Sequence, residues 1–310
     1  TILHSTREEV LAACPDTLAP ILLKYRELQK RITTYGYNIL EFVENGRIYP
    51  SWMQNFTTTG RMSCTRPNCQ NLPRDKKYRA CIEAPERGRL LLADYSQIEL
   101  RIAAKMANEP KMFQAYLNNF DLHTLTAQLI LNKTDVTKED RQIAKSANFA
   151  LLYGAGVDKF RRYSKMSYGV DLSIEEATRI RNTFFTHYSK LRDWHKRQGG
   201  GEGPLNTRTL AGRWRENVEK FSEKLNSPVQ GSGADGLKLA LALLYENHNL
   251  SYGYFPVIAA HDELVLEGSE YCAKQAAEWL KSCMINSMAW MLYPVPVEVG
   301  VNIGQSWAEK

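Results

Sequence analysis

Apolar residues recur at three- and four-residue spacing near the start of the chain, which predicts a helical segment over about residues 5–39. The apolar residues on that face are Ile21, Leu22, Tyr25, Leu28 and Ile32. From Asn45 to Pro73 the chain is instead dense in Gly, Pro, Asn, Thr and Ser. That composition predicts loops and short strands rather than a core helix.

An apolar run in the first third of the chain stops abruptly at an acid. Leu90–Ala93 leads directly into Asp94, and apolar residues then recur every four positions from Ile98 to Met106. A short unbroken apolar run followed by helical spacing predicts a buried strand that leads into a helix. Asp94 would then lie where the strand ends.

A long helical pattern runs from about Phe113 to His195, with interruptions at 154–157 and 168–171. The glycine-rich stretch Gly199–Gly203 follows it and predicts a flexible turn or linker, with a natural, an engineered or a shortened loop as the alternatives. The chain contains no internal repeat. These features predict one extended helical region in the middle of the sequence.

Two further apolar runs, Val257–Ala260 and Leu264–Leu266, lie close together near the end of the chain. The residues between them are His261, Asp262 and Glu263. This pattern predicts a β-hairpin with acids at its bend. A helix is predicted over about residues 271–291, and the alternation from Val295 to Val301 predicts a last strand.

The composition indicates a folded protein of roughly two domains. With 310 residues, 44% hydrophobic and 24% charged, the chain is unlike a disordered or fibrous protein. Its net charge of +6 points only weakly to nucleic acid. Basic residues gather, often beside aromatic ones, at Lys24–Arg31, Arg74–Arg79, Lys159–Lys165 and Arg208–Lys220. These clusters suit either a phosphate-tracking surface or the solvated faces of several helices.

The six cysteines lack the paired spacing of a zinc site, so we expect reduced thiols in a cytosol-like compartment. No apolar stretch approaches the roughly 18 residues of a membrane span, and the N-terminus lacks the pattern of a secretion signal. The chain begins at Thr1 rather than Met. We therefore expect a fragment or a processed product.

Asp94, Asp262 and Glu263 are predicted at strand ends beside an apolar sheet. Carboxylates in such positions are costly unless they are paired or bind a metal ion. If the two strands are neighbours, Asp94 and Asp262 could share divalent cations, since Mg²⁺ prefers one or two carboxylates together with substrate phosphates. Each acid could instead simply cap a turn.

A helix is predicted over residues 138–153, because Thr137 and Asp140 have capping-box spacing and Gly154 is a typical C-terminal stop. Four residues on one face of it follow at four-residue steps: Arg141, Lys145, Phe149 and Tyr153. Two cations followed by two rings suit a nucleotide, with phosphate bound by the cations and the base stacked on the rings. The same spacing also suits a helix that packs its aromatic end into the core.

Together these residues resemble the family A DNA polymerases. Asp94–Arg101 matches the family's motif A, Arg141–Gly154 its motif B and His261–Glu263 its motif C, in that order. Further matches are Thr59–Arg61, Asn68–Pro73, Asp121–Thr124, Pro228–Gly231 and Ala234–Asp235. The resemblance extends over nearly the whole chain from about Ile21.

The resemblance implies an α+β fold of the right-hand polymerase type, with an antiparallel palm sheet that bears Asp94 and Asp262. The implied parts are remnant thumb helices at 1–44, palm at 45–116, fingers at 117–225 and palm again at 226–310. The motif B helix, 138–153, lies within the fingers. Because the thumb is only a remnant, we expect a weak grip on DNA, and a short segment from Arg215 to Pro228 indicates trimmed fingers.

For catalysis, the resemblance implies two Mg²⁺ ions, for which Mn²⁺ can substitute, held by Asp94, Asp262 and the backbone carbonyl of Tyr95. Glu263 and Lys145 are the other catalytic candidates, with Lys145 as proton donor to the departing pyrophosphate. The residues implied to bind the nucleotide are Arg141, Lys145, Phe149, Tyr153, His123, Glu99, Gln97 and Tyr95. Among them, His123 would help the two cations offset charge. Glu99 would occupy the space of a ribose 2′-hydroxyl, so deoxynucleoside triphosphates are the expected substrate.

Primer-template DNA is the implied partner. The residues implied to contact it are Arg61, Asn68, Gln70, Asn71, Gln230 and His261. Arg61, Gln230 and His261 would contact the primer end or the minor groove, where acceptors common to all correct pairs allow shape to be checked without reading sequence. Asn68 and Gln70 would contact the template strand.

Three function classes remain to be separated. The leading one is a DNA-templated DNA polymerase without a proofreading exonuclease in this chain. The second is a phage-type RNA polymerase or a reverse transcriptase on the same scaffold, although phage-type RNA polymerases lack a Glu at the position of Glu99. The third is a non-catalytic nucleic-acid-binding module. We expect a monomer with no membrane partner, cytoplasmic or nucleoid-associated, with an organellar location and a processivity partner left open.

Overall fold

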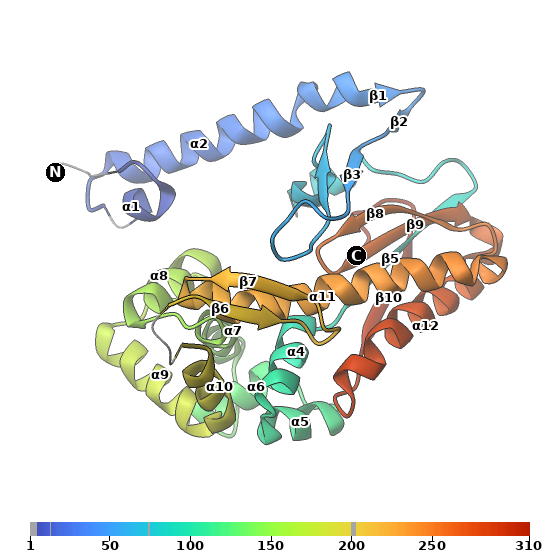
Figure 1. Cartoon of the computed structure of the whole chain (residues 1–310). Helices are drawn as coiled ribbons and strands as arrows, with labels where there is room; N and C mark the ends of the chain where they lie inside the picture. Colours follow the sequence, from blue (N-terminus) through green and yellow to red (C-terminus); the bar gives the residue numbers. More distant parts are fainter. Residues whose placement is uncertain (1–4, 13, 74, 200–202) are drawn as a thin grey trace.

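The computed structural model describes residues 5–12, 14–73, 75–199 and 203–310, and it contains a four-stranded antiparallel sheet (Figure 1). Its strands are β5 (Gly88–Tyr95), β8 (Phe255–Ala260), β9 (Glu263–Ser269) and β10 (Val299–Gly304), in the order β10-β5-β9-β8. The predicted strand before Asp94 and the predicted hairpin around Asp262 are both confirmed. Because β5 and β9 are neighbours, the end of one meets the start of the other.

Alternate residues of β5 enter two different apolar cores. Leu91 and Ala93 belong to the larger core on the helical side, whereas Leu90 and Leu92 pack on the other side with Trp307. All four β5 residues are at most 1% exposed. A strand covered on both faces is apolar throughout rather than alternating, which explains the unbroken run in the sequence.

Helices cover one face of the sheet. They are α4 (Ile98–Ala107), which follows β5 as predicted, α11 (Phe221–Glu246) and α12 (Ala273–Leu292), which matches the helix predicted near residues 271–291. Figure 1 shows α11 and α12 lying side by side. Gly236 of α11 permits this packing, because a Cβ there would lie 1.7 Å from the sulfur of Met288.

The middle of the chain is helical, as predicted, and lies beside the sheet with its helices (Figure 1). It contains α5 (Pro110–Leu117), α6 (Leu122–Leu131), α7 (Lys138–Leu152), α8 (Val157–Tyr168), α9 (Ile174–His187) and α10 (Ser189–Gly199). The predicted interruptions at 154–157 and 168–171 separate α7 from α8 and α8 from α9. A hairpin of β6 (Leu205–Arg208) and β7 (Trp214–Val218) follows and packs on α11.

The first part of the chain has short elements around one long helix. They are α1 (Glu8–Ala12), α2 (Leu18–Tyr35), η1 (Tyr37–Phe42), β1 (Val43–Glu44), β2 (Arg47–Ile48), β3 (Ser51–Met53), β4 (Ser63–Thr65), η2 (Cys69–Asn71) and α3 (Lys76–Arg79). The predicted helical segment is therefore present, although it is divided. Its apolar face on α2 is exposed, with Ile21, Tyr25 and Ile32 each at least 60% accessible. Two short turns, η3 (His248–Leu250) and η4 (Glu270–Cys272), complete the described elements.

Three features differ from the sequence predictions or were missed by them. The last strand begins at Val299 rather than Val295, because Pro296 has no N–H to donate to a ladder. Helix α11 was not predicted, since Pro228 and three internal glycines give it the composition of a turn. The β6–β7 hairpin was not predicted either. Of the predicted linker Gly199–Gly203, residues 200–202 lie outside the described residues.

None of the helices in the described part of the chain combines the length and apolar character needed to cross a bilayer.

Candidate active site

Two carboxylates and one backbone segment meet at an edge of the four-stranded sheet. Asp94, next to last in β5, pairs in register with Glu263, the first residue of β9. Asp262 precedes Glu263 in the β8–β9 turn, and its carbonyl accepts a hydrogen bond from the Tyr95 N–H at 3.2 Å. The structure thus brings Asp94, Tyr95 and Asp262 together from two segments that are far apart in the sequence.

The charges at this edge suit a divalent cation. Burial raises the pKa of the Asp262 carboxyl, and nearby Asp94 and Glu99 raise it further, while the Lys310 ammonium opposes them. Lys310 Nζ lies 3.3 Å from Asp94 Oδ2. In the described residues no group of three or more His, Cys, Asp or Glu side chains forms a metal site by itself. Two carboxylates with a backbone oxygen leave positions for water and phosphate, which is the ligand set that Mg²⁺ prefers.

Glu263 faces a different set of partners. Its buried carboxylate accepts a hydrogen bond from the Trp307 indole N–H at 2.6 Å and lies 3.1 Å from Lys310 Nζ and 3.6 Å from an Arg79 nitrogen. Arg79 also stacks over the Trp307 ring, with its guanidinium carbon 4.4 Å from the ring centroid. The Glu263 carboxylate is therefore held on the side of the sheet where Trp307 packs. A catalytic role for Glu263 stays a prediction.

Helix α7 begins and ends where the sequence predicted. Thr137 and Asp140 form a reciprocal capping box at its start, with the Asp140 N–H donating to Thr137 Oγ1 at 3.1 Å. The helix ends at Leu152, Tyr153 is its C-cap, and Gly154 has a φ of +72°, which glycine adopts without strain. Both ends of this helix are thus fixed by local sequence.

Arg141 on α7 is already paired inside the protein. Its Nε and Nη2 donate to the two carboxylate oxygens of Asp121 at 2.8 and 3.0 Å. Burial alone would raise the pKa of Asp121, but hydrogen bonds from Arg141 and Thr124 hold it well below its usual range. Asp121 also caps α6 by accepting from the Thr124 N–H at 2.9 Å. Arg141 would have to share or leave this partner in order to bind phosphate.

Lys145 and His123 present different chemistry from one another. Lys145 Nζ lies 5.8 Å from the centroid of the Tyr168 ring, a cation–π contact that leaves its donors available. His123 is 3% exposed, and burial lowers its pKa to about 4, so it is neutral near pH 7. Its Nδ1 pairs with the Asn148 amide at 2.9 Å, and its ring lies 5.9 Å from that of Phe149. A role for His123 in offsetting charge on the triphosphate stays a prediction.

Glu99 connects three segments of the candidate site. One carboxylate oxygen accepts from Arg61 Nη2 at 2.7 Å, and the other accepts from the Tyr153 hydroxyl. Burial raises the pKa of Tyr153 well above its ordinary value, and the Glu99 charge adds to that shift. Gln97 directly precedes α4, and its amide donates to Asp121 Oδ1 at 3.3 Å rather than to Glu99. The start of α4, the end of α7 and the Thr57–Arg61 loop are therefore tied together at Glu99.

The predicted DNA-contacting residues gather on one side of the sheet. Arg61, Gln70 and His261 line one small pocket. The Gln70 amide nitrogen donates to the carbonyls of Met62 and Ala259, both at 3.0 Å, so it is partly committed to the fold.

The other members of this set hold neighbouring positions. Asn68 caps η2 by accepting from the Gln70 N–H at 3.1 Å. Asn71 is exposed, and its backbone carbonyl accepts from the Tyr35 hydroxyl. Gln230 is half-buried on α11, one turn before Ala234, which lines the same pocket. A DNA contact by each of these residues stays a prediction.

Several residues with a place in this region were not singled out by chemistry in the sequence. Asp121 was noted only as part of a motif, although an Asp before an apolar helix is an N-cap signal that could have indicated its place. Lys310, Tyr168 and Arg213 have partners distant in the sequence, and no local pattern points to them.

Comparison with known proteins decides the family. A sequence model of DNA polymerase family A matches residues 1–309. The chain belongs to DNA polymerase family A. Within this family, DNA polymerase I of Aquifex aeolicus (strain VF5) is 36% identical over 313 residues, which cover 98% of this chain and 54% of the relative. The thermostable DNA polymerase I of Thermus aquaticus is 32% identical over 330 residues, covering 98% and 38%. This family A chain thus spans about half or less of the length of these relatives.

A solved structure supports the same assignment. The POL domain of Pol1 from M. smegmatis, in complex with DNA primer-template and dNTP, matches with a TM-score of 0.84 and 27% sequence identity. The match covers 98% of this family A chain and 56% of the other. The chain therefore has the α+β right-hand polymerase fold that its motifs implied.

Proposed function

We propose that this chain catalyses template-directed DNA synthesis, in which deoxynucleoside triphosphates are added to a primer 3′-hydroxyl and pyrophosphate is released. The observation that carries the proposal is the meeting of Asp94, Tyr95 and Asp262 at one edge of the sheet. Family membership supports it, as does the likeness to a polymerase domain in complex with primer-template and dNTP.

We also propose a division of the chain into palm, fingers and thumb. Residues 45–116 and 226–310 contain the four-stranded sheet and would form the palm. Residues 117–225 contain α6–α10 and the β6–β7 hairpin and would form the fingers. Residues 1–44 contain α1 and α2 and would be the part of the thumb present in this chain.

Asp94, Asp262 and the Tyr95 carbonyl would hold two Mg²⁺ ions, which would activate the primer hydroxyl and stabilise charge on the triphosphate. The fit rests on hard oxygen donors and on the raised pKa of Asp262 beside Asp94. A divalent cation would stabilise the two charged carboxylates and lower that pKa again. Lys310 balances part of this charge in the structure described here. Mn²⁺ offers the same preference for oxygen ligands and would substitute.

The α7 face would bind the incoming nucleotide. Arg141 and Lys145 would grip the triphosphate, and Lys145, which has no carboxylate partner in the described residues, would be placed to give a proton to the departing pyrophosphate. Phe149 and Tyr153 would stack at the new base pair. His123 would donate a hydrogen bond from its neutral ring.

Glu99 would select the sugar. Its carboxylate is fixed from two sides by Arg61 and Tyr153, so a group that needs its space would have to break one of these contacts. A ribose 2′-hydroxyl is such a group, and the proposed substrate is therefore a deoxynucleotide. Arg61, Asn68, Gln70, Asn71, Gln230 and His261 would contact primer-template DNA.

A monomer in the cytoplasm or at the nucleoid is the setting we propose for this activity. Bacterial DNA polymerase I proteins dominate the similar proteins described above, which supports that setting.

Primer extension in Mg²⁺ tests the proposal, with the wild type, Asp94→Ala and Asp262→Ala assayed at equal folded concentration. Because a bound metal contributes several kcal/mol to the transition state, each alanine variant should lose roughly 10³-fold or more in rate. Asp171→Ala is the matched control, since Asp171 is an exposed acid whose ion-pair partner among the described residues is Lys165. An alanine variant at 94 or 262 that matched this control would refute the assignment.

The competing functions give different products in the same assay. Equal use of ribo- and deoxynucleotides would favour an RNA polymerase and would count against Glu99 as the sugar gate. DNA binding without any extension would indicate a non-catalytic module.

A further inference from the structure

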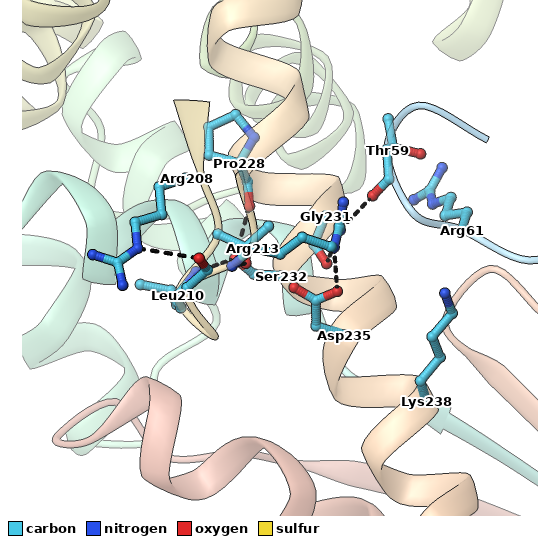
Figure 2. A network of polar contacts seen from close by, with 12 residues as sticks. Thr59, Arg61, Arg208, Leu210, Arg213, Pro228, Gly231, Ser232, Asp235 and Lys238 are labelled. Atoms are coloured by element: carbon cyan, nitrogen blue, oxygen red, sulfur yellow. Dashed lines mark hydrogen bonds and ion pairs between the residues drawn. The ribbon is translucent and has the colours of Figure 1, made fainter. Parts of the chain in front are cut away.

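A tight turn presents Arg213 from the tip of the β6–β7 hairpin. The Thr209 N–H donates to the Arg213 carbonyl at 2.9 Å, and the Arg213 N–H donates to Thr209 Oγ1 at 3.0 Å. Gly212 has a φ of +96°, a conformation that favours glycine. The turn is therefore fixed locally, and it directs the Arg213 side chain away from the hairpin (Figure 2).

The hairpin tip is docked on α11. The Leu210 N–H donates to Ser232 Oγ at 2.8 Å, and the Ser232 hydroxyl donates to the Pro228 carbonyl at 2.7 Å (Figure 2). Gly231 permits the close approach, because a Cβ there would lie 2.7 Å from the Thr209 methyl carbon and 2.9 Å from Arg213 Nη2. These contacts thus fix the position of the hairpin tip on α11.

The Arg213 guanidinium joins this pair to a third segment. Its Nε donates to Asp235 Oδ1 at 2.8 Å, and its Nη2 donates to the carbonyls of Gly231 at 3.2 Å and Thr59 at 2.7 Å (Figure 2). Gly60, with a φ of +82°, lies against the guanidinium, where a Cβ would be only 2.4 Å from Nη2. The guanidinium is therefore enclosed between Gly60 on one side and Gly231 on the other.

The segment held in this way is the Thr57–Arg61 loop. It is closed on itself, because the Gly60 N–H donates to the Thr57 carbonyl at 2.9 Å and Thr57 Oγ1 donates to the Arg61 carbonyl at 2.7 Å. Its last residue, Arg61, reaches Glu99 at 2.7 Å. A displacement of Thr59 would consequently be transmitted to the contact between Arg61 and Glu99.

We propose that Arg213 is a positioning residue for the sugar and primer-end site, which it serves by fixing the Thr57–Arg61 loop to α11 and thereby orienting Arg61 against Glu99. The inference rests on the proposed function. Among the described residues the guanidinium contacts Thr59, Gly231 and Asp235 and not the carboxylate edge, so Arg213 would act through the loop. A guanidinium is needed because three acceptors in different directions must be met by one rigid planar group, which an ammonium cannot do in the same way.

The test compares Arg213→Lys with Arg208→Lys, which make the same change at two positions of one hairpin and leave the net charge unaltered. Arg208 contacts only the Gly212 carbonyl and the Trp214 ring among the described residues. The measurement is the ratio of kcat/KM for a deoxynucleotide to kcat/KM for the matching ribonucleotide. Arg213→Lys should lower this ratio roughly tenfold, because small displacements at a positioning residue have large effects on rate. Arg208→Lys should stay within about twofold of the wild type.

A double-mutant cycle with Arg61 distinguishes positioning from general destabilisation. If Arg213 acts through Arg61, then adding Arg213→Lys to Arg61→Ala should change the ratio little beyond the effect of Arg61→Ala alone. Multiplied effects of the two substitutions would overturn the proposal. So would an unchanged sugar ratio in an Arg213→Lys variant whose melting temperature has fallen.

Hydrogen exchange gives a readout that does not depend on activity. Amides of residues 57–61 should exchange faster in Arg213→Lys than in Arg208→Lys, because the tie to Thr59 is lost. If Arg213→Lys does not fold, Asp235→Asn replaces it, since it keeps the shape of the partner and removes its charge. Unchanged exchange in this loop would refute the inference, whereas absence of primer extension by the wild type would instead refute the proposed function.

Discussion

The carboxylate edge of the sheet and the α7 face differ in how their charged groups are held. Asp94 and Asp262 are fixed by strand register and by a turn, and together they concentrate negative charge beside Lys310. On the α7 side, Arg141 is already matched by Asp121 in a two-point contact. The first region is thus fixed by the backbone, whereas Arg141 in the second would have to exchange partners in order to bind a phosphate.

This difference teaches that the two halves of the site respond differently to substitution. Removing a carboxylate from this edge would delete a proposed metal ligand. Removing Asp121 on the α7 side would instead release Arg141. The free energy needed to break the Arg141–Asp121 pair would then no longer oppose phosphate binding. The predictions below test this contrast.

The largest effect is expected at the carboxylate edge, where two adjacent acids can be compared. Asp262→Asn should lower the rate of primer extension roughly 10³-fold, since it removes a proposed metal ligand. Glu263→Gln should lower the rate far less and should lower the melting temperature, because Glu263 is held by Trp307, Lys310 and Arg79. Steady-state kinetics and thermal melts of both variants check this. Equal loss of rate would show that Glu263 is itself catalytic.

The next largest effect is expected at Lys145. Lys145→Ala should reduce kcat/KM for the nucleotide by roughly 10²-fold, as expected for loss of a charged contact to phosphate and of a proton donor. Its dissociation constant for primer-template should stay near that of the wild type, because the proposed partner is the triphosphate. Lys159→Ala is a suitable control, being an exposed lysine on α8. An equal loss of DNA affinity would contradict the assignment.

Acid should weaken the helical region through His195. This buried side chain bonds the Leu152 carbonyl at 2.9 Å, at the end of α7, and burial lowers its pKa to about 4 from an ordinary 6.5. The unfolded chain therefore takes up a proton that the folded chain does not. The associated stability is complete above pH 6.5 and falls by about 3 kcal/mol towards pH 4.

Urea unfolding between pH 7.5 and 4.5 measures this dependence. His123 shifts in the same direction, so the informative quantity is the difference in slope between the wild type and His195→Gln. The variant should depend less on pH. Parallel curves for the two proteins would exclude a contribution from His195.

The smallest effect, but of opposite sign, is expected at Asp121. Asp121→Asn keeps an acceptor for the Thr124 N–H while weakening the hold on Arg141. The KM for the nucleotide should fall by a few fold, because Arg141 is more easily released to phosphate. Arg141→Ala should raise the same KM. If Asp121→Asn also raised it, the pair would be a supporting contact and the proposed exchange of partners would be wrong.

Local signals predicted the parts of the site that lie within one element. Strand burial and helix capping depend on only a few neighbouring residues. The sequence therefore predicted the strand before Asp94 and the start of α7. The family resemblance then supplied the roles. By contrast, α11 was hidden by Pro228 and its glycines, whose packing reasons exist only in the folded protein.

Contacts between distant segments could not be predicted in this way. Asp121 supplies Arg141 with a partner that the spacing along α7 does not indicate, and burial lowers the pKa of His123. Both depend on how α6 packs against α7. Sequence spacing along one helix contains no information about that neighbour.

The enclosure of Arg213 between Gly60 and Gly231 has a consequence for how this sequence can diverge. A methyl group at either glycine would crowd the guanidinium, so a side chain at Gly60 or Gly231 would require Arg213 to shift. Loss of Arg213 would remove that restriction and leave the Asp235 carboxylate without its counter-ion. In a library randomised at Gly60, Arg213, Gly231 and Asp235, functional clones should therefore retain or lose these four residues together. The first and the last of them are 175 positions apart in the sequence.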